Sequence, residues 1–447
     1  MTNSAARASG EQDAERAYAA QVDAHLMRNY LAHLGHGLLG QTGFRLLNAP
    51  TFLPAYILML SGGSNIAVGI VLSLQALGMT LTPLLSANLI EHRPRVLPVG
   101  FSTGAAMRLM ILCIAASGLL LPPTAALWAI AFFMLGFGLF MGMQGVIFNF
   151  LMSKVIPVSK RGRLTGLRNF LAGLTAAAVA WLAGTYLLGE DPSVTGYSWT
   201  FLLAFVLTSI GLSLLLFVRE PEPPRLRMRT PLTRRLGEIP GLLRADRAFA
   251  VYVLARALAT MGRMAAPFYI LYAGMEIGLT GPVLGTLTMA FTLAGTVSNL
   301  GWGALADRHG FRIALLSSIA LWILSTLALI FGSGLLFTTL VFVGIGAAFQ
   351  GFQQAAMNLT LEFGQRDELP MRIALANTAS EVAGTIGPLL GGLLAAALGY
   401  SAVFAVSITF LAAGGWMLVR YVPEPRYRPL GGMTTEGQES GDSAKRD

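Results

Sequence analysis

The chain has 447 residues, of which 54% are hydrophobic and only 12% are charged, and its mean hydropathy is +0.63. Soluble globular proteins carry about 25% charged residues, so this composition excludes an ordinary soluble domain. The formal net charge is +9, but the sequence contains no nucleic-acid-binding motif, and we expect no nucleic-acid partner.

The hydrophobic residues form runs that are long enough to cross a bilayer, which takes about 20 residues of helix for each crossing. This pattern predicts an all-α integral membrane protein with the lipid bilayer as its partner. In chain order, the predicted spans are 38–61, 65–90, 96–119, 124–152, 164–188, 197–218, 248–273, 281–305, 311–332, 334–360, 370–397 and 401–421.

Lysine and arginine are distributed unevenly among the connections between these spans. They are absent from alternate connections, namely 61–65, 120–124, 189–198, 274–281, 331–334 and 398–401, and they are concentrated in the other set. Cytoplasmic connections carry the excess of lysine and arginine, so both termini are predicted to be cytoplasmic. We expect a multi-pass protein of the cell membrane, and the short loops and high arginine and alanine content favour a bacterial inner membrane.

The predicted spans divide the chain into five segments: a cytoplasmic tail (1–37), a first six-helix bundle (38–218), a cytoplasmic linker rich in proline and arginine (219–247), a second six-helix bundle (248–421) and a cytoplasmic C-terminal tail (422–447). His33 and His36 lie three residues apart before the first span. We interpret them as part of a cytoplasmic helix face, because no cluster of further metal ligands accompanies them. No metal and no cofactor are expected.

The two halves resemble each other in order and spacing. Residues 54–58 of the first span match residues 267–271 of the seventh, and Gly136 and Gly138 match Gly344 and Gly346. Six-span repeats of this kind, related by an axis along the membrane normal, are typical of one large transporter architecture.

The connection between spans 8 and 9, residues 303–312, reads Gly-Ala-Leu-Ala-Asp-Arg-His-Gly-Phe-Arg. It resembles the signature loop G-x-L-A-D-R-x-G-R-R of the major facilitator superfamily, and the corresponding loop at 87–95 is a degenerate version of it. The resemblance implies two pseudo-symmetric six-helix bundles that rock about a central site, and therefore a secondary transporter rather than an enzyme.

The resemblance also implies a gate at the cytoplasmic side, which the acid of the signature loop helps to close. By this analogy, Asp307, which precedes Arg308, faces Arg372 at the start of span 11, and Glu91 faces Arg163 at the start of span 5. The alternative is that these charges serve only to set the topology.

Few ionisable residues fall inside the predicted spans, where a charge costs about 2.5–3.5 kcal/mol on insertion scales and usually serves a function. Arg45 precedes a predicted helix break at residues 48–50, and Arg256 and Arg263 lie seven residues apart on one face of span 7. Arginines on these two spans are similar to those of organic-anion carriers in the superfamily. We therefore expect Arg45, Asn48, Arg256 and Arg263 to bind an anionic substrate; the alternative is that Arg45 and Arg256 extend to the cytoplasmic face.

Amide side chains form a stripe on span 10, where Gln350, Gln354 and Asn358 are four residues apart and share one helix face. Gln144 and Asn149 give a weaker counterpart on span 4. We predict that these amides line a cavity and contact the substrate, although amides inside membranes also bridge neighbouring helices.

Glu381 is the only acid deep within a predicted span. We hypothesise that it exchanges a proton and couples transport to the proton gradient. The alternative is a structural ion pair with Arg263 or with Arg108, an arginine of span 3 for which the sequence predicts no role.

These features predict a secondary active transporter that moves a small molecule by alternating access, with an organic anion as the favoured substrate and a proton or substrate gradient as the energy source. The chain has no phosphate-binding motif of the kind that an ATP-driven pump needs. One alternative is an exporter of drugs or metabolites with amphipathic substrates. Another is a transport-dead membrane scaffold or sensor, because a fold does not fix a function.

Overall fold

The computed structural model describes residues 13, 16–82, 89–90, 93–222, 241–363 and 369–424, and this part of the chain is helical, without strands. The elements of the first half are α2 (Leu26–Asn48), α3 (Phe52–Leu60), α4 (Asn65–Leu81), α6 (Leu97–Leu120), α7 (Pro123–Val155), α8 (Val158–Leu182), η1 (Ala183–Leu188), α9 (Val194–Ser213) and η2 (Leu214–Phe217). Those of the second half are α11 (Arg247–Met261), η3 (Gly262–Ala265), α12 (Ala266–Ile277), α13 (Gly281–His309), α14 (Phe311–Phe331), α15 (Leu335–Leu361), α16 (Leu369–Leu398) and α17 (Tyr400–Tyr421).

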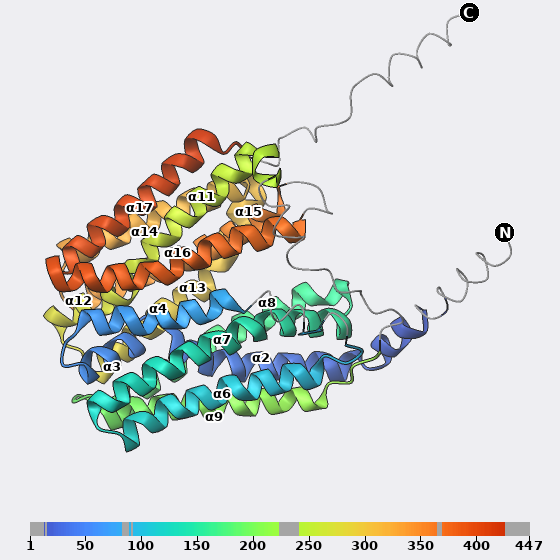
Figure 1. Cartoon of the computed structure of the whole chain (residues 1–447), viewed down its shortest axis with the longest axis horizontal. Coiled ribbons are helices and arrows are strands. Elements are labelled where there is room, and N and C mark those ends of the chain that lie inside the picture. The colour runs from blue at the N-terminus through green and yellow to red at the C-terminus, as the bar shows by residue number, and fades with distance from the viewer. Residues whose placement is uncertain are drawn as a thin grey trace, which may run out of the picture.

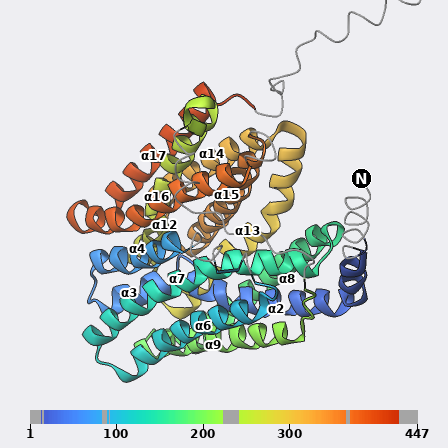
Figure 2. The ribbon, with the colours of Figure 1, turned by 45° about the vertical axis from the view of Figure 1, so that its right-hand side comes forward.

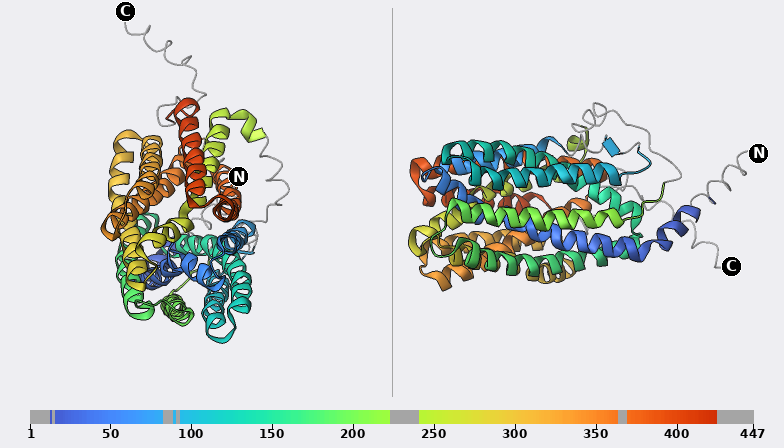
Figure 3. Two further views of the ribbon diagram at one scale, coloured as in Figure 1. Left: turned by 90° about the vertical axis from the view of Figure 1, so that its left-hand side faces the viewer. Right: turned by 90° about the horizontal axis from the view of Figure 1, so that it is seen from below.

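The helices run roughly along the long axis of the molecule and form two bundles (Figures 1 and 2). Seen end-on, the first half occupies the lower part and the second half the upper part of the left panel of Figure 3. Because the helices alternate in direction, Leu26 and Tyr421 lie at one end, which we call the terminus end. The connections at 61–64, 189–193 and 278–280 lie at the other, which we call the far end.

Ten of the described helices are long and apolar enough to cross a membrane. Helix α4 has a shorter apolar part, Asn65–Thr80, and the first predicted span is divided between α2 and α3. With these two, every predicted span contains helical structure. The predicted helix pattern is therefore confirmed. The bilayer core contains no water, so a single segment that crosses it must satisfy its own backbone N–H and C=O groups, and a helix does this.

The break in the first span falls where the sequence predicted it. Helix α2 ends at Asn48, Ala49 adopts an extended conformation, and α3 begins at Phe52 after Pro50. In the second half, the 3-10 turn Gly262–Ala265 interrupts the corresponding span just before Pro267. Proline lacks a backbone donor and clashes with the preceding turn, which explains why both interruptions lie beside one.

The first helix begins earlier than the predicted start of span 1 at residue 38. Helix α2 starts at Leu26, and the Asn29 side chain is tied to the backbone of Arg219 by hydrogen bonds of 3.0 and 2.8 Å. His33 and His36 are both buried. The sequence analysis interpreted these histidines as part of a helix face, and they do lie on a helix; both side chains are buried because this part of α2 continues between its neighbours.

At the far end the two halves contact each other closely through α4 with α16, through α8 and η1 with α13, and through α3 with α12. A side chain at Gly69 would lie 2.5 Å from the carbonyl oxygen of Pro388, and one at Gly184 would clash with the backbone of Gly281. The Gly281 N–H also donates to the carbonyl oxygen of Gly189 at 2.7 Å. Small residues thus allow helix backbones of different halves to approach closely.

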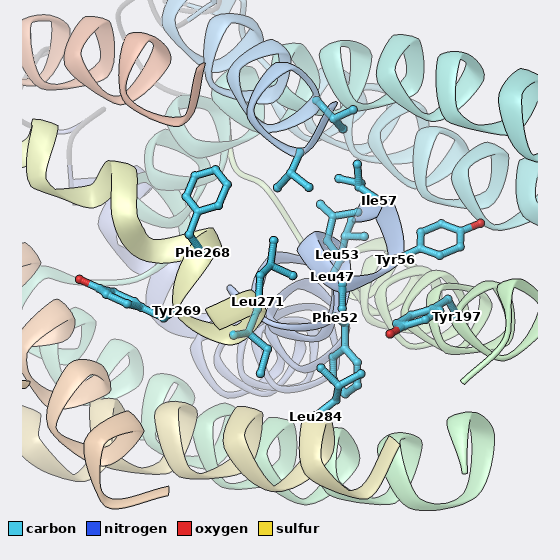
Figure 4. Close-up of a cluster of buried hydrophobic side chains, with 14 of the residues drawn as sticks. Leu47, Phe52, Leu53, Tyr56, Ile57, Tyr197, Phe268, Tyr269, Leu271 and Leu284 are labelled. Atoms are coloured by element: carbon cyan, nitrogen blue, oxygen red, sulfur yellow. The ribbon is translucent and has the colours of Figure 1, made fainter. Parts of the chain in front are cut away.

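Side chains complete the closure of the far end. The hydroxyl groups of Thr51 and Thr288 form a buried hydrogen bond of 2.6 Å, and the Tyr400 hydroxyl donates to Asn65 at 2.9 Å. Figure 4 shows apolar and aromatic side chains of α3 and α12 gathered in one cluster, with Leu284 of α13 beside Phe52. This cluster spans both halves.

The terminus end is organised differently, because its buried ion pairs join elements of the same half. Lys154 at the end of α7 pairs with Glu220, which also accepts hydrogen bonds from the backbone N–H groups of Val96 and Leu97 at the start of α6. In the second half, Arg372 of α16 pairs with Asp246 at 2.7 Å. Each half is therefore fastened to itself at this end.

Candidate functional site

A cavity of about 680 Å³ lies between the two halves in the part of the molecule nearer the terminus end. Its walls come from α2, α4, α6, α7 and α8 of the first half and from α11, α15 and α16 of the second. The lining residues are His36, Gly37, Gly40, Gln41, Phe44, Met79, Thr80, Met107, Arg108, Met141, Gly142, Gln144, Gly145, Val146, Phe148, Arg168, Arg256, Gln353, Met357, Ala374, Asn377, Thr378 and Glu381.

Three arginines, Arg108, Arg168 and Arg256, face this cavity together with one acid, Glu381. With every one of these groups charged, the lining carries a net charge of two positive units. A cavity with this excess attracts anions, and its low-dielectric walls strengthen the attraction.

Arg108 of α6 is held by backbone carbonyl groups of its own half. Its Nε donates to Thr208 at 2.8 Å, and one of its terminal nitrogens donates to Gly104 at 2.8 Å. The side chain is 4% exposed, and no acid neutralises it within the described part of the chain. Arg108, which had no predicted role, therefore contributes a fixed positive charge to the cavity wall.

Arg256 of α11 is buried and is held by two neutral partners. Its terminal nitrogens donate to the hydroxyl of Thr360 at 3.1 Å and to the side-chain oxygen of Asn377 at 2.9 Å. The alternative that Arg256 extends to the cytoplasmic face does not hold, because the side chain is buried and points between α15 and α16.

Arg168 of α8 lies with its guanidinium over the ring of Phe148, 5.2 Å from the ring centroid. Its Nε is buried without a hydrogen-bond partner. Glu381 of α16 borders the same cavity from the second half, and its carboxylate makes no hydrogen bond or ion pair with the described residues. The site therefore contains one cation and one acid whose charged groups are not occupied by protein partners.

A second cavity of about 250 Å³ adjoins the first, since both are bordered by Phe44 and Gln353. Arg45, Asn48 and Gln350 line it, as the sequence analysis expected of cavity residues. Arg45 donates to the hydroxyl of Thr296 in the other half at 3.2 Å. Arg45 therefore points inward rather than to the membrane surface.

Arg263 borders neither of these two cavities. Its guanidinium lies 4.9 Å from the ring centroid of Phe349, a residue that lines the smaller cavity, and the charge of Glu381 acts on it. Arg263 thus packs behind a residue that lines the smaller cavity. Its contact with the substrate stays a prediction.

The amide stripe of α15 leaves the cavity after Gln350. Gln353 and Met357 line the larger cavity, whereas Gln354 lies near Gly303 of α13 and Asn358 donates to the backbone of Gln354. Because a helix has 3.6 residues per turn, residues spaced exactly four apart rotate gradually away from one face. The residues of α15 that line the cavities are instead three and four positions apart.

On α7, Gln144 lines the larger cavity and accepts a hydrogen bond of 3.0 Å from Thr103. Asn149 is exposed and borders neither cavity. The structure therefore brings together only the first member of this predicted pair.

The gating residues lie at the terminus end. Arg163, Asp307 and Arg308 are exposed, and Glu91 lies outside the described residues. Arg372 is buried, pairs with Asp246 and lies over the ring of Phe249, 4.6 Å from its centroid. Because Asp246 also caps the start of α11 through the N–H of Phe249 at 3.0 Å, it locks α16 to α11.

Sequence reasoning missed Arg168, Gln353, Asn377 and Asp246 as site residues. Asp246 had a detectable signal, because an aspartate directly before a helical run is a common N-cap. Arg168 had a weaker one, since it lies in predicted span 5 and any charge there is a candidate.

The model of the Major Facilitator Superfamily matches this chain over residues 39–270 and 252–439. Multidrug resistance protein D of Escherichia coli (strain K12) is 27% identical over 174 residues. That alignment covers 38% of this chain and 44% of the relative, so the chain matches less than half of the relative's length.

Three solved structures share the fold at low sequence identity. A D-xylose-proton symporter has a TM-score of 0.69 at 16% identity, over 91% of this chain and all of that chain. A variant of the nucleoside transporter NupG has a TM-score of 0.67 at 14% identity, covering 87% and 98%. A bacterial homologue of the iron transporter ferroportin, in its inward-facing state, has a TM-score of 0.66 at 13% identity, covering 89% and 99%.

The family match extends over both halves, and the helical architecture and the cavity between the halves agree with it. This chain is a multi-pass membrane protein that belongs to the Major Facilitator Superfamily.

Proposed function

We propose that this protein is a secondary transporter of organic anions that works by alternating access. The observation that carries the proposal is the charge of the larger cavity, where Arg108, Arg168 and Arg256 face a single acid, Glu381. An anion that enters this cavity gains charge-assisted hydrogen bonds, which are about twice as strong as neutral ones.

The direction in which the cavity faces follows from the distribution of basic residues. Connections at the terminus end contain the lysines and arginines, and cytoplasmic loops carry this excess. The terminus end is therefore cytoplasmic in our proposal, and the structure corresponds to an inward-facing state with the far end closed. In this arrangement the gate that closes in the opposite state is formed by Glu91, Arg163, Asp307, Arg308 and Arg372.

Glu381 is our proposed coupling group. It faces the cavity, its carboxylate makes no hydrogen bond or ion pair with the described residues, and its charge acts on Arg263. Protonation of Glu381 when the anion binds removes the one negative charge that the described residues place in the wall, which links the two events electrostatically.

The test uses purified protein in proteoliposomes. Wild-type protein is expected to exchange labelled organic anions across the bilayer and to accumulate them when a proton gradient is imposed. Glu381→Gln is expected to retain the exchange and to lose the gradient-driven accumulation, because glutamine cannot release a proton. Absence of anion exchange by the wild type contradicts the anion proposal, and a Glu381→Gln variant that still accumulates substrate excludes Glu381 as the coupling site.

A second candidate function is the export of amphipathic drugs or metabolites. Four methionines, Met79, Met107, Met141 and Met357, line the cavity, and flexible thioethers adapt to apolar groups of different shapes. The partial relationship to a multidrug resistance protein supports the same direction. Exchange of neutral or cationic amphiphiles without anion exchange would favour this candidate.

A further inference from the structure

The three arginines of the larger cavity differ in how many of their guanidinium N–H donors already have hydrogen-bond partners within the protein. Arg108 donates to two backbone carbonyl groups, and Arg256 donates to Thr360 and Asn377. Arg168 makes no hydrogen bond and no ion pair with the described residues, and its buried Nε is unsatisfied. A buried donor without a partner costs free energy, so Arg168 is the arginine that gains most from an incoming anion.

The position of Arg168 depends on two neighbours from other helices. The ring of Phe148 on α7 lies under the guanidinium, and such a cation–aromatic contact holds the planar group without using its N–H donors. Gly37 of α2 lies beside the aliphatic stem, where a side-chain carbon would clash with Cγ and Cδ of Arg168. The ring of Phe148 and the lack of a side chain at Gly37 together orient the guanidinium of Arg168, with its unused N–H donors, toward the cavity.

The wall that the first half contributes to this cavity includes several apolar side chains beside its polar ones. Phe148, Phe44, Met107 and Met141 line the same cavity within the first half. A small hydrated anion would gain only the contact with the charged group, whereas an anion with an apolar body would in addition bury that body against these side chains. The chemistry therefore selects a molecule with a single anionic group and an apolar remainder.

We infer that Arg168 is the residue that binds the anionic group of the substrate, and that the adjoining methionine and phenylalanine wall makes this site specific for amphipathic organic anions. The inference rests on the proposed anion transport and adds the substrate class and the principal ligand. The planar guanidinium offers two parallel donors, which match a carboxylate, sulfonate or phosphate group.

The experiment measures binding to the purified full-length protein in detergent. The probes are aryl and alkyl carboxylates, sulfonates and phosphates, such as 4-phenylbutyrate, each beside a neutral counterpart such as 4-phenylbutyramide. The variants are Arg168→Gln, Gly37→Ala and, as a matched control, Lys160→Gln. Lys160 lies on the same helix α8, is exposed and borders neither cavity, so the control removes one positive charge without touching the site.

Wild-type protein and Lys160→Gln are expected to bind the amphipathic anions alike and more tightly than the neutral counterparts. Arg168→Gln should weaken anion binding by roughly 10- to 100-fold, the range expected for hydrogen bonds to a charged group, and should leave the affinity for the neutral amides unchanged. Gly37→Ala should weaken anion binding as well, because it displaces the guanidinium although the charge of the cavity stays the same.

The outcomes separate the inference from the function on which it rests. If the wild type binds no anion of the panel, the proposed function fails. If the wild type binds anions and Arg168→Gln binds them equally well, the function stands and the role of Arg168 is overturned. An equal loss of anions and neutral amides in Arg168→Gln, with an intact fold by size-exclusion chromatography, also overturns the inference, because it indicates a structural rather than a charge-specific role.

Discussion

The two ends of this transporter are held together by different chemistry. At the far end, contacts cross between the halves and are uncharged: glycine backbones, the pair Thr51 and Thr288, and the cluster of α3 and α12. At the terminus end, buried ion pairs fasten each half to itself, through Glu220 in the first and Asp246 in the second. Neutral contacts separate without exposing a buried charge, whereas a buried pair resists separation. The difference fits two rigid halves that part at an uncharged seam.

The largest effect on this difference between the two ends is expected from Glu220→Ala, which removes the buried ion pair with Lys154 at the terminus end. The substitution leaves the 7% exposed Lys154 side chain without its acid and leaves two backbone N–H groups of α6 without an acceptor. We expect a loss of about 3–5 kcal/mol in stability, measured by reversible unfolding in sodium dodecyl sulfate. Glu222→Ala is the matched control. Its pair with Arg95 is 59% and 65% exposed on the two sides, so the effect should stay below about 1 kcal/mol. Equal effects would contradict the assignment of Glu220 as a lock.

The far-end seam can be opened with Gly184→Ala. The new methyl group would clash with the backbone of Gly281, which cannot move aside as a side chain can. Overpacking of this kind costs about 1–3 kcal/mol, which should shift the equilibrium away from the closed far end by roughly 5- to 150-fold. The shift is read from maleimide labelling of Leu284→Cys, a buried far-end position, in a Cys113→Ala background. Gly166→Ala is the control on α8, because no atom lies within 4 Å of its added carbon. Equal labelling in the two variants would show that Gly184 does not form the seam.

The smallest expected effect comes from Thr51→Val, which removes one hydrogen bond across the seam and keeps the shape of the side chain. Thr288 still donates to the backbone of Leu284, so no donor is left unsatisfied. We expect a cost of about 1 kcal/mol for the closed far end, and hence about a fivefold rise in labelling of the same cysteine. Thr409→Val, at an exposed position whose hydroxyl bonds only its own helix, should leave labelling unchanged. A similar rise in labelling in both variants would contradict a stabilising role of the hydrogen bond between Thr51 and Thr288.

The fold could be predicted in large part because its signals are local. The length of the apolar runs predicted span 8 at 281–305, and the structure has α13 at Gly281–His309. It predicted span 12 at 401–421, and the structure has α17 at Tyr400–Tyr421. The break beside Pro50 was also predictable, since it follows from the proline itself. The start of α2 was not, because residues 26–37 are too polar to register as a span and are helical through packing against α8 and α9.

The site was less predictable than the fold. Arg45, Asn48, Gln144, Arg256, Gln350 and Glu381 line the two cavities, and their polarity inside apolar spans was the signal that identified them. Gln354 and Asn149 carried the same signal and point elsewhere. Local spacing gives the face of a helix to within about a residue, and a difference of one residue, such as Gln353 against Gln354, rotates a side chain by about 100°.

The sequence by itself determined the membrane class, the helix pattern and the family, because hydrophobic run length, charge asymmetry and the signature loop are properties of short segments. Only the tertiary structure decided which arginines are already occupied. Arg108 and Arg256 are satisfied by Thr208, Thr360 and Asn377, partners at least 100 residues away in the chain. Arg168 stands free over Phe148 beside Gly37. Whether a buried donor has a partner depends on which distant helices meet, and no local pattern encodes that.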